Sequence, residues 1–525
     1  MRLHALFAVA MLWVGCAHVK TVGGLDASVR EVPGGYITGR VVALEQPSVL
    51  DNKDFVYSIG LDETGTRAAF TRLAGKTFNL SVWTLGSPAA AVIDVATNPY
   101  EFDVEAVAFS PDGTHVATAG RDGAVRLFGS ADGKLLAETY AEEPLVALAF
   151  LPDGAHLVVG SARGMLTVYS APELAWISDV RAHTDEVRAI ATTSEGLLVS
   201  GGWDKSIAVF ETVKAPLPID EVRLVIGAVG NVRVVRVGFE RGMGAFAFDA
   251  AQPRVIIGEK LAKQAGIEPS LLTETVMVGG HSARIARNRT LTLKYLQVPG
   301  IDVTICDACL PADVHGVLGA PVLERFDFRV DEGTGELVLT PKEKTAPTNL
   351  PSVLTLREVK RHRFDSYVND LSIDRAGKRL GVAFSFEKAE RNREVYQREK
   401  RGEAAPFNAG DFAAIVEVES GSVVKRWTPH LGVVSTVAIS PDGETLASGG
   451  WDKKLFVMHE TEEQPALTEK FGWSIRRARF SKDGRLLAVG AWTPQNAVGN
   501  QESDPSAVVY AVGYSTAQVI APPSP

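Results

Sequence analysis

Short apolar runs alternate with glycine-ending turns along most of the chain. Runs such as VEAVAF, LVALAF, VSTVAI and IRRARF are typical of half-buried or buried strands. Each run is followed by a four-residue turn and then by another apolar run. The turns are DETG at Asp62–Gly65, SPDG at Ser110–Gly113, LPDG at Leu151–Gly154, TSEG at Thr193–Gly196, DRAG at Asp374–Gly377, SPDG at Ser440–Gly443 and SKDG at Ser481–Gly484. Asp or Pro opens such a turn and glycine supplies the positive φ that closes it, so the pattern predicts an all-β protein.

The turns recur at a regular interval. Three of the six intervals between their closing glycines are 41 or 42 residues, which fits the period of about 40–45 residues of a four-stranded propeller blade. The hexapeptide SGGWDK occurs twice, at Ser200–Lys205 and at Ser448–Lys453. The longest interval, from Gly196 to Gly377, indicates a large insertion. Seven turns therefore predict seven blades, with an insertion between the fourth and the fifth.

The repeats resemble those of the WD-repeat propeller family. In that family a His before the first strand, a Ser or Thr in the second strand and an Asp in the next turn form a buried hydrogen-bonded set. The resemblance assigns this role to two sets, His183, Ser200 and Asp204, and His430, Ser448 and Asp452. We interpret these histidines as structural rather than catalytic, because in such a set each buried polar group has a hydrogen-bond partner, as a stable core requires.

Residues 214–342 lack the turn motif and contain a different pattern. Apolar strands lead to GAFAFD at Gly244–Asp249, a helical pattern follows and ends at Gly266, and a later apolar run contains Val317–Gly319. This order resembles the retropepsin-like aspartic peptidases, a family with a small β-barrel fold. In them a strand delivers an Asp-Thr-Gly or Asp-Ser-Gly loop, and an apolar-apolar-Gly run crosses behind it.

The resemblance makes Asp249 the candidate catalytic residue, but Ala250 and Ala251 replace the other two residues of the family's triplet. The family mechanism needs two carboxylates that share one proton, so a single domain of this kind must dimerise to be active. Three interpretations remain open: a non-catalytic binding module, an active dimeric peptidase, and a different fold. For Asp249 alone, the simplest role is to cap the turn that follows its strand.

Cys306 and Cys309 form the only other chemical motif in the insertion. A local disulfide is the state expected in an exported protein. A zinc site would need two further ligands, for which only His281 and His315 lie near in sequence, and a redox motif would need a βαβ setting. We therefore predict a possible disulfide and no metal or other cofactor.

The first residues, MRLHALFAVAMLWVGC, resemble a bacterial lipoprotein signal. Arg2 gives a short positive region, and the apolar run that follows is too short for a stable membrane anchor. The resemblance implies cleavage before Cys16 and lipidation of Cys16, and Ala17 after it favours the outer membrane. The alternative is a plain secretory signal with an incidental Cys. Either interpretation predicts export.

Composition fits a globular chain without a nucleic-acid partner. Hydrophobic residues make up 46% and charged residues 22% of 525 residues, and the net charge of −9 comes without a basic block suited to phosphate. The densest basic run, Arg357–Arg363, is interpreted as a solvated loop. The predicted division is a signal peptide (1–15), a lipidated tether (16–54), blades one to four (55–213), the insertion (214–342), blades five to seven (343–520) and a disordered tail (521–525). Within the tether, Tyr36–Leu44 is one possible early strand.

Two functions follow from these observations. The first is an envelope-anchored scaffold that binds an unidentified protein or peptide partner through its propeller, with the insertion as a binding module. The second is a dimeric aspartic peptidase that acts on peptides outside the cytoplasm. A homodimer through the insertion is required only by the second function.

Overall fold

The computed structural model describes most of the chain between residues 36 and 520. The described ranges are 36–38, 41–50, 55–74, 77–85, 95–96, 104–141, 143–216, 221–240, 242–294, 296–333, 335–342, 352–385, 411–472, 474–492, 507–514 and 518–520. The predicted signal peptide, Cys16 and the predicted tail lie outside these residues.

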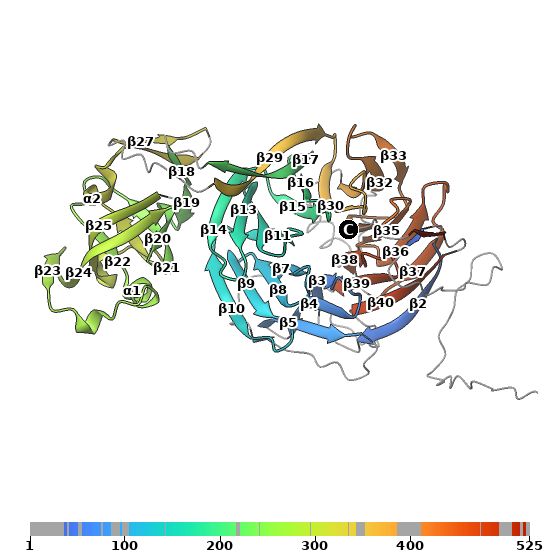
Figure 1. The fold of residues 1–525 in the computed structure, drawn as a ribbon, viewed down its shortest axis with the longest axis horizontal. Helices are drawn as coiled ribbons and strands as arrows, with labels where there is room; N and C mark the ends of the chain where they lie inside the picture. Colours follow the sequence, from blue (N-terminus) through green and yellow to red (C-terminus); the bar gives the residue numbers. More distant parts are fainter. Residues whose placement is uncertain are drawn as a thin grey trace, which may run out of the picture.

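The described residues contain seven four-stranded antiparallel sheets, arranged around a centre (Figure 1). In order from the innermost strand they are: β3 (Phe55–Leu61), β4 (Arg67–Ala74), β5 (Thr77–Thr84) and β6 (Val95–Ala96); β7 (Val104–Phe109), β8 (His115–Gly120), β9 (Ala124–Gly129) and β10 (Leu135–Tyr140); β11 (Leu145–Phe150), β12 (His156–Ser161), β13 (Met165–Ser170) and β14 (Trp176–Arg181); β15 (Val187–Thr192), β16 (Leu197–Gly202), β17 (Ser206–Pro216) and β29 (Ser352–Arg363); β30 (Tyr367–Ile373), β31 (Arg379–Ser385), β32 (Phe412–Glu417) and β33 (Val423–Trp427); β34 (Val434–Ile439), β35 (Thr445–Gly450), β36 (Lys454–His459) and β37 (Leu467–Lys470); and β38 (Ser474–Phe480), β39 (Leu486–Trp492), β40 (Ala507–Tyr514) and β2 (Val41–Leu50). This is the β-propeller architecture that the repeated turns predict.

The glycine-ending turns join the first two strands of each sheet, as the sequence pattern predicts. In the turn after β7 the Ser110 hydroxyl donates to the Asp112 carboxylate and accepts from the amide of His115. Gly113 closes the turn with a φ of +69°, a conformation that glycine adopts without a steric penalty. The turns at Ser440 and Ser481 repeat these contacts. The same hydrogen bonds therefore form the turn in three hairpins whose strands differ in sequence.

The innermost strands contact one another in a closed circle, and the apolar faces of adjacent sheets pack together. The cluster between the fourth and fifth sheets, for example, includes Val199, Val209 and Phe384, all fully or almost fully buried. The core is thus a series of layers between neighbouring sheets, in which each sheet supplies both of its faces.

The seventh sheet is completed by β2, from the beginning of the chain. β2 pairs with β40 from Val41↔Tyr514 to Leu50↔Ala507, and Val41 and Leu44 are buried in the core of that sheet. This corrects the interpretation of residues 16–54 as a tether, since residues 41–50 belong to the propeller. A shorter pair, β1 (Tyr36–Thr38) with β41 (Gln518–Ile520), also joins the two ends.

The insertion interrupts the fourth sheet instead of following it. β17 continues beyond the sheet to Pro216, β29 returns from Ser352, and the two pair along their whole length as a ribbon. The prediction that the insertion lies between the fourth and fifth blades is therefore wrong by one strand. Arg357–Arg363 belongs to β29, so the interpretation of this run as a loop is also wrong; Arg357, for example, pairs with Glu211 of β17.

The insertion contains a barrel and a small sheet. Its elements are β18 (Val222–Val225), β19 (Gly227–Val229), β20 (Val232–Phe239), β21 (Gly242–Phe248), β22 (Val255–Ile257), α1 (Glu259–Gln264), η1 (Pro269–Leu271), β23 (Thr275–Val278), β24 (His281–Leu293), β25 (Leu296–Ile305), η2 (Asp307–Cys309), β26 (Gly316–Leu318), α2 (Ala320–Leu323), β27 (Phe326–Asp331) and β28 (Glu336–Pro341). The larger sheet has the order β19-β20-β21-β26-β22-β25-β24-β23, and pairing of β20 with β24 closes it, while β18, β28 and β27 form a second sheet. Among the described helices, none has the length and apolar character needed to cross a bilayer.

The insertion lies beside the second and third sheets (Figure 1). Arg236 donates hydrogen bonds to the hydroxyl of Tyr169 at 3.0 Å and to that of Thr139 at 2.9 Å. Lys294 forms an ion pair with Asp179 at 2.9 Å, with both side chains mostly buried. The insertion is therefore held by polar contacts as well as by the β17–β29 ribbon.

Candidate functional site

The innermost strand of every sheet contains a β-bulge near its beginning. In each strand one residue is skipped in the pairing with the second strand, and these residues are Tyr57, Glu105, Val146, Arg188, Asn369, Ser435 and Arg476. Six of the seven, all except Val146, line one small pocket at an end of the central channel. Because a bulge re-aims a side chain, the fold directs residues from six sheets to a single place. We call these seven positions the rim.

The rim was not identified from the sequence, although a regular signal marks it. Each rim residue lies five residues before the first residue of its turn motif, as Glu105 does before Ser110 and Arg188 does before Thr193. The side chains differ from sheet to sheet, so no residue pattern reveals them. Only alignment of the seven turns against each other would have found them.

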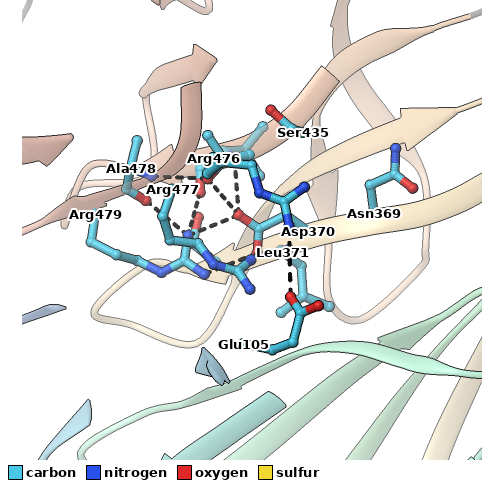
Figure 2. Close-up of polar contacts among 12 residues, drawn as sticks. Glu105, Asn369, Asp370, Leu371, Ser435, Arg476, Arg477, Ala478 and Arg479 are labelled. Carbon is cyan, nitrogen blue, oxygen red and sulfur yellow. Dashed lines mark hydrogen bonds and ion pairs between the residues drawn. The ribbon is translucent and has the colours of Figure 1, made fainter. Parts of the chain in front are cut away.

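Charged side chains of the rim and of residues beside it form an ion-pair network. Glu105 accepts a hydrogen bond from Arg121 at 2.8 Å and lies 3.6 Å from Arg476, as Figure 2 shows for the second contact. Glu186 pairs with Arg121 at 3.2 Å and with Arg188. Burial tends to raise the pKa of Glu105, but Arg476, Arg121 and Arg188 outweigh it and lower that pKa to about 2. Glu105 is therefore ionised at neutral pH.

A second layer of charge lies deeper, around Asp370 (Figure 2). The Asp370 carboxylate is fully buried and contacts Arg477 at 3.0 Å and Arg479 at 2.9 Å. It also accepts hydrogen bonds from the hydroxyl of Thr436 at 2.7 Å and the amide of Val437 at 3.1 Å. The network therefore joins the fifth, sixth and seventh sheets.

Burial acts in opposite ways on the two partners. Burial tends to raise the pKa of Asp370, but Arg479 and Arg477 outweigh it and lower that pKa. Burial lowers the pKa of Arg477 to about 10 despite the attraction of Asp370, and the nearby Arg479 and Arg188 add to the lowering. Both groups are charged at neutral pH. For Asp370 the neighbouring arginines outweigh the effect of burial on the pKa, whereas for Arg477 the attraction of Asp370 does not.

The channel opens into a larger cavity beyond this layer. The cavity has a volume of about 310 Å³ and is lined by the innermost strands and their turns, including Arg188, Arg477, Arg479 and Lys482. The rim pocket at the other end has a volume of about 20 Å³. Arg188 and Arg477 line both spaces, so guanidinium groups separate the rim from the cavity.

The structure brings both predicted His-centred sets together. Nδ1 of His183 lies 2.9 Å from Asp204 and Nε2 lies 2.8 Å from the Ser200 hydroxyl, and His430 repeats both distances with Asp452 and Ser448. Both imidazoles are buried. In each set the ring donates from Nδ1 to the carboxylate and accepts at Nε2 from serine, which is a satisfied arrangement that fixes the turn to the strands.

The Asp204 carboxylate makes this arrangement sensitive to acid. Burial tends to raise the pKa of Asp204, but hydrogen bonds from His183, Ser206 and Thr184 lower it to about 2 from an ordinary value of 3.8. A carboxylate with a depressed pKa stabilises the fold above its unfolded pKa, and the stabilisation is lost as the pH falls to its folded pKa.

We expect wild type to exceed Asp204→Asn in unfolding free energy by about 2 kcal/mol at pH 6, and this difference to disappear between about pH 4 and pH 2. Urea unfolding of both proteins across that range measures it, and a constant difference would contradict the assignment.

Asp249 lies on the loop that follows β21 and is exposed. Its carboxylate accepts a hydrogen bond from the amide of Ala251 at 2.9 Å, and its own amide donates to the carbonyl of Leu318 at 3.0 Å. β21 and β26 are parallel neighbours, with Phe248 paired to Leu318. Gly319 lies so close beneath the loop that a Cβ atom there would meet the carbonyl oxygen of Arg254 at 2.1 Å. The two segments singled out from the sequence are thus adjacent, and the carboxylate caps its own turn.

The remaining predicted residues lie apart from this loop. Cys306 and Cys309 are joined by a disulfide at η2. His315 directly precedes β26 and accepts a hydrogen bond at Nδ1 from the amide of Ala245 in β21, and burial lowers its pKa. Among the described residues, no group of three or more His, Cys, Asp or Glu side chains is placed to hold a metal ion.

Comparison with protein-family models matches the WD domain, G-beta repeat, at residues 95–129, 176–211 and 421–457. Each match begins on the outermost strand of one sheet and continues through the first three strands of the next. A search of curated proteins finds no match to the chain. The chain therefore contains three WD repeats, which support a WD-repeat propeller. The second and third of them contain the two His-centred sets.

Proposed function

We propose that this protein is an interaction scaffold, in which a seven-bladed propeller closed by β2 presents its rim to a partner protein. The observation that carries the proposal is the convergence of six bulged residues on one pocket. These positions vary from sheet to sheet while the surrounding turns repeat, as expected where a regular fold carries a specific surface. WD repeats favour the same class of function.

We further propose that a lipid on Cys16 holds the scaffold at the bacterial cell envelope, at the outer membrane. The lipoprotein-like signal and Ala17 support this placement. A single acyl chain binds a bilayer only marginally, so stable anchoring needs the several chains of a bacterial lipoprotein.

The insertion serves as a binding module of retropepsin-like ancestry without peptidase activity. Two observations support this role. Ala250 and Ala251 replace the residues that brace the loop in the peptidase family, and Asp249 already uses one carboxylate oxygen to accept the amide of Ala251. The loop is exposed, which suits contact with a partner.

The second candidate function is a dimeric aspartic peptidase. The observation in its favour is the parallel pairing of β21 with β26 and the hydrogen bond from Asp249 to Leu318, which match the strand order of that family. It requires Asp249 of two chains to meet across an interface between two insertions.

Site-specific photo-crosslinking in cells tests the scaffold proposal. A photoreactive residue replaces Ser435 at the rim in one strain, and Asp153, on an exposed turn at the other end of the channel, in a control strain. A discrete adduct from position 435 only, lost when Arg476→Glu is added, supports the rim as the partner surface. Identical adducts from both positions, or none from position 435, would refute it.

Lipidation is tested by replacing the predicted anchor. Cells are labelled with a palmitate analogue, and the protein is partitioned in a detergent that separates on warming. We expect the wild type to carry label and enter the detergent phase, and Cys16→Ser to do neither, because the acyl chains supply the membrane affinity. A wild-type protein without label in the aqueous phase would favour a plain secretory signal.

Peptidase activity is tested on the intact protein with a diverse peptide library between pH 4 and pH 7. We expect wild type and Asp249→Asn to give the same background hydrolysis, at concentrations high enough to permit dimerisation. Cleavage by the wild type that is lost in Asp249→Asn would establish the peptidase function instead.

A further inference from the structure

The rim pocket combines a small volume with a high density of guanidinium groups. We propose that it binds a carboxylate from an acidic segment of the partner protein. This inference rests on the proposed scaffold function and names the chemistry of the partner.

Charge at the channel favours an anion. Arg121 and Arg188 face Glu105 and Glu186 at the rim, and Arg477 and Arg479 face Asp370 alone in the deeper layer. Among the described residues, four guanidinium groups therefore face three carboxylates, and Arg476 joins the same network through Glu105. The whole chain has a net charge of −9, so this positive excess is a local feature. Buried charge without full compensation is costly, and an incoming carboxylate would reduce that cost.

Arg188 provides a donor for this carboxylate. Its side chain is mostly buried, pairs with Glu186, and lies over the ring of Trp203 at 4.8 Å. Among the described residues, its Nε has no hydrogen-bond partner. A buried guanidinium N–H rarely remains without an acceptor, so this atom indicates a group supplied from outside the chain.

The size of the pocket limits what can enter. A volume of about 20 Å³ exceeds the space needed for one water molecule and suits a single carboxylate. Glu105 on the same wall is held by Arg121 and Arg476, so it disfavours a second negative group. The geometry therefore fits one Asp or Glu side chain at a time, with neighbouring acidic residues contacting the exposed parts of Arg121 and Arg476.

Fluorescence polarisation on the full-length protein in detergent tests the inference. The probes are three labelled 12-residue peptides of matched composition, one rich in Asp and Glu, one with Asn and Gln in their place, and one with Lys. We expect the acidic peptide to bind best, and its affinity to fall at least tenfold in Arg188→Gln and as NaCl is raised. The matched control, Arg233→Gln, removes an exposed arginine of the insertion and should leave the affinity unchanged.

Each alternative result has a definite meaning. Equal affinity of wild type and Arg188→Gln for the acidic peptide would overturn the assignment. Preference for the neutral or basic peptide, lost in Ser435→Arg, would overturn the acidic partner and leave the scaffold function intact. Stabilisation by citrate or inorganic phosphate, without binding of any peptide, would show a site for free anions and likewise overturn the inference. If Arg188→Gln fails to fold, the salt dependence and the ranking of the three peptides on wild type still decide.

Discussion

Replacement of Asp370 by Asn is expected to destabilise the propeller by about 3–5 kcal/mol, because it removes the counter-charge of the buried Arg477 and of the partly exposed Arg479. Asp370 is fully buried, and its carboxylate contacts both arginines, the Thr436 hydroxyl and the Val437 amide. Thermal and urea unfolding, followed by tryptophan fluorescence, measure the loss.

A second ion pair at the channel provides the control. Glu63 and Lys482 are both substantially exposed at the turns of the first and seventh sheets. Glu63→Gln is therefore expected to cost less than about 1 kcal/mol, as exposed pairs do. If Asp370→Asn proved no more destabilising than Glu63→Gln, the interpretation of the deep layer as a tie between sheets would be wrong.

Deletion of residues 1–50 is expected to abolish stable folding of the seventh sheet. The deletion removes β2, and burial of Val41 and Leu44 alone contributes about 3–6 kcal/mol. It also exposes β40 as an unpaired edge, which promotes association between copies. Size-exclusion chromatography and thermal unfolding should show aggregates and a lower, broader transition.

Deletion of residues 1–35 is the matched comparison, because it leaves β1 and β2 in place. We expect this shorter deletion to unfold at the temperature of the full chain. Equal stability of the two deletions would mean that β2 does not close the propeller.

Features specified by local chemistry could be predicted from the sequence. The Ser-Pro-Asp-Gly turn encodes its own hydrogen bonds and its positive φ, so the hairpins and their period are apparent in the residues. The disulfide partners lie three residues apart and meet within one turn. The helical pattern that ends at Gly266 corresponds to α1, which spans Glu259–Gln264.

Features that depend on distant partners could not be predicted. β2 carries no local sign that its partner β40 lies at the other end of the chain. β29 is the outermost strand of the fourth sheet, so many of its side chains are charged and its sequence resembles that of a loop. Its pairing with β17, in which Arg357 lies opposite Glu211, is apparent only in the structure. The ion pairs of Asp370 with Arg477 and Arg479, and that of Glu105 with Arg476, join residues more than one hundred positions apart. Their chemistry depends on closure of the ring and not on any motif.

The β17–β29 ribbon has a consequence for engineering and for evolution. Pro216 and Ser352 are paired neighbours on adjacent antiparallel strands, so the chain leaves the propeller and re-enters it at almost the same point. A two-residue turn of the Asn-Gly type is sufficient to join such strands. The fourth sheet therefore has a natural grafting point, where the whole insertion can be excised or exchanged for another domain while the propeller keeps its register.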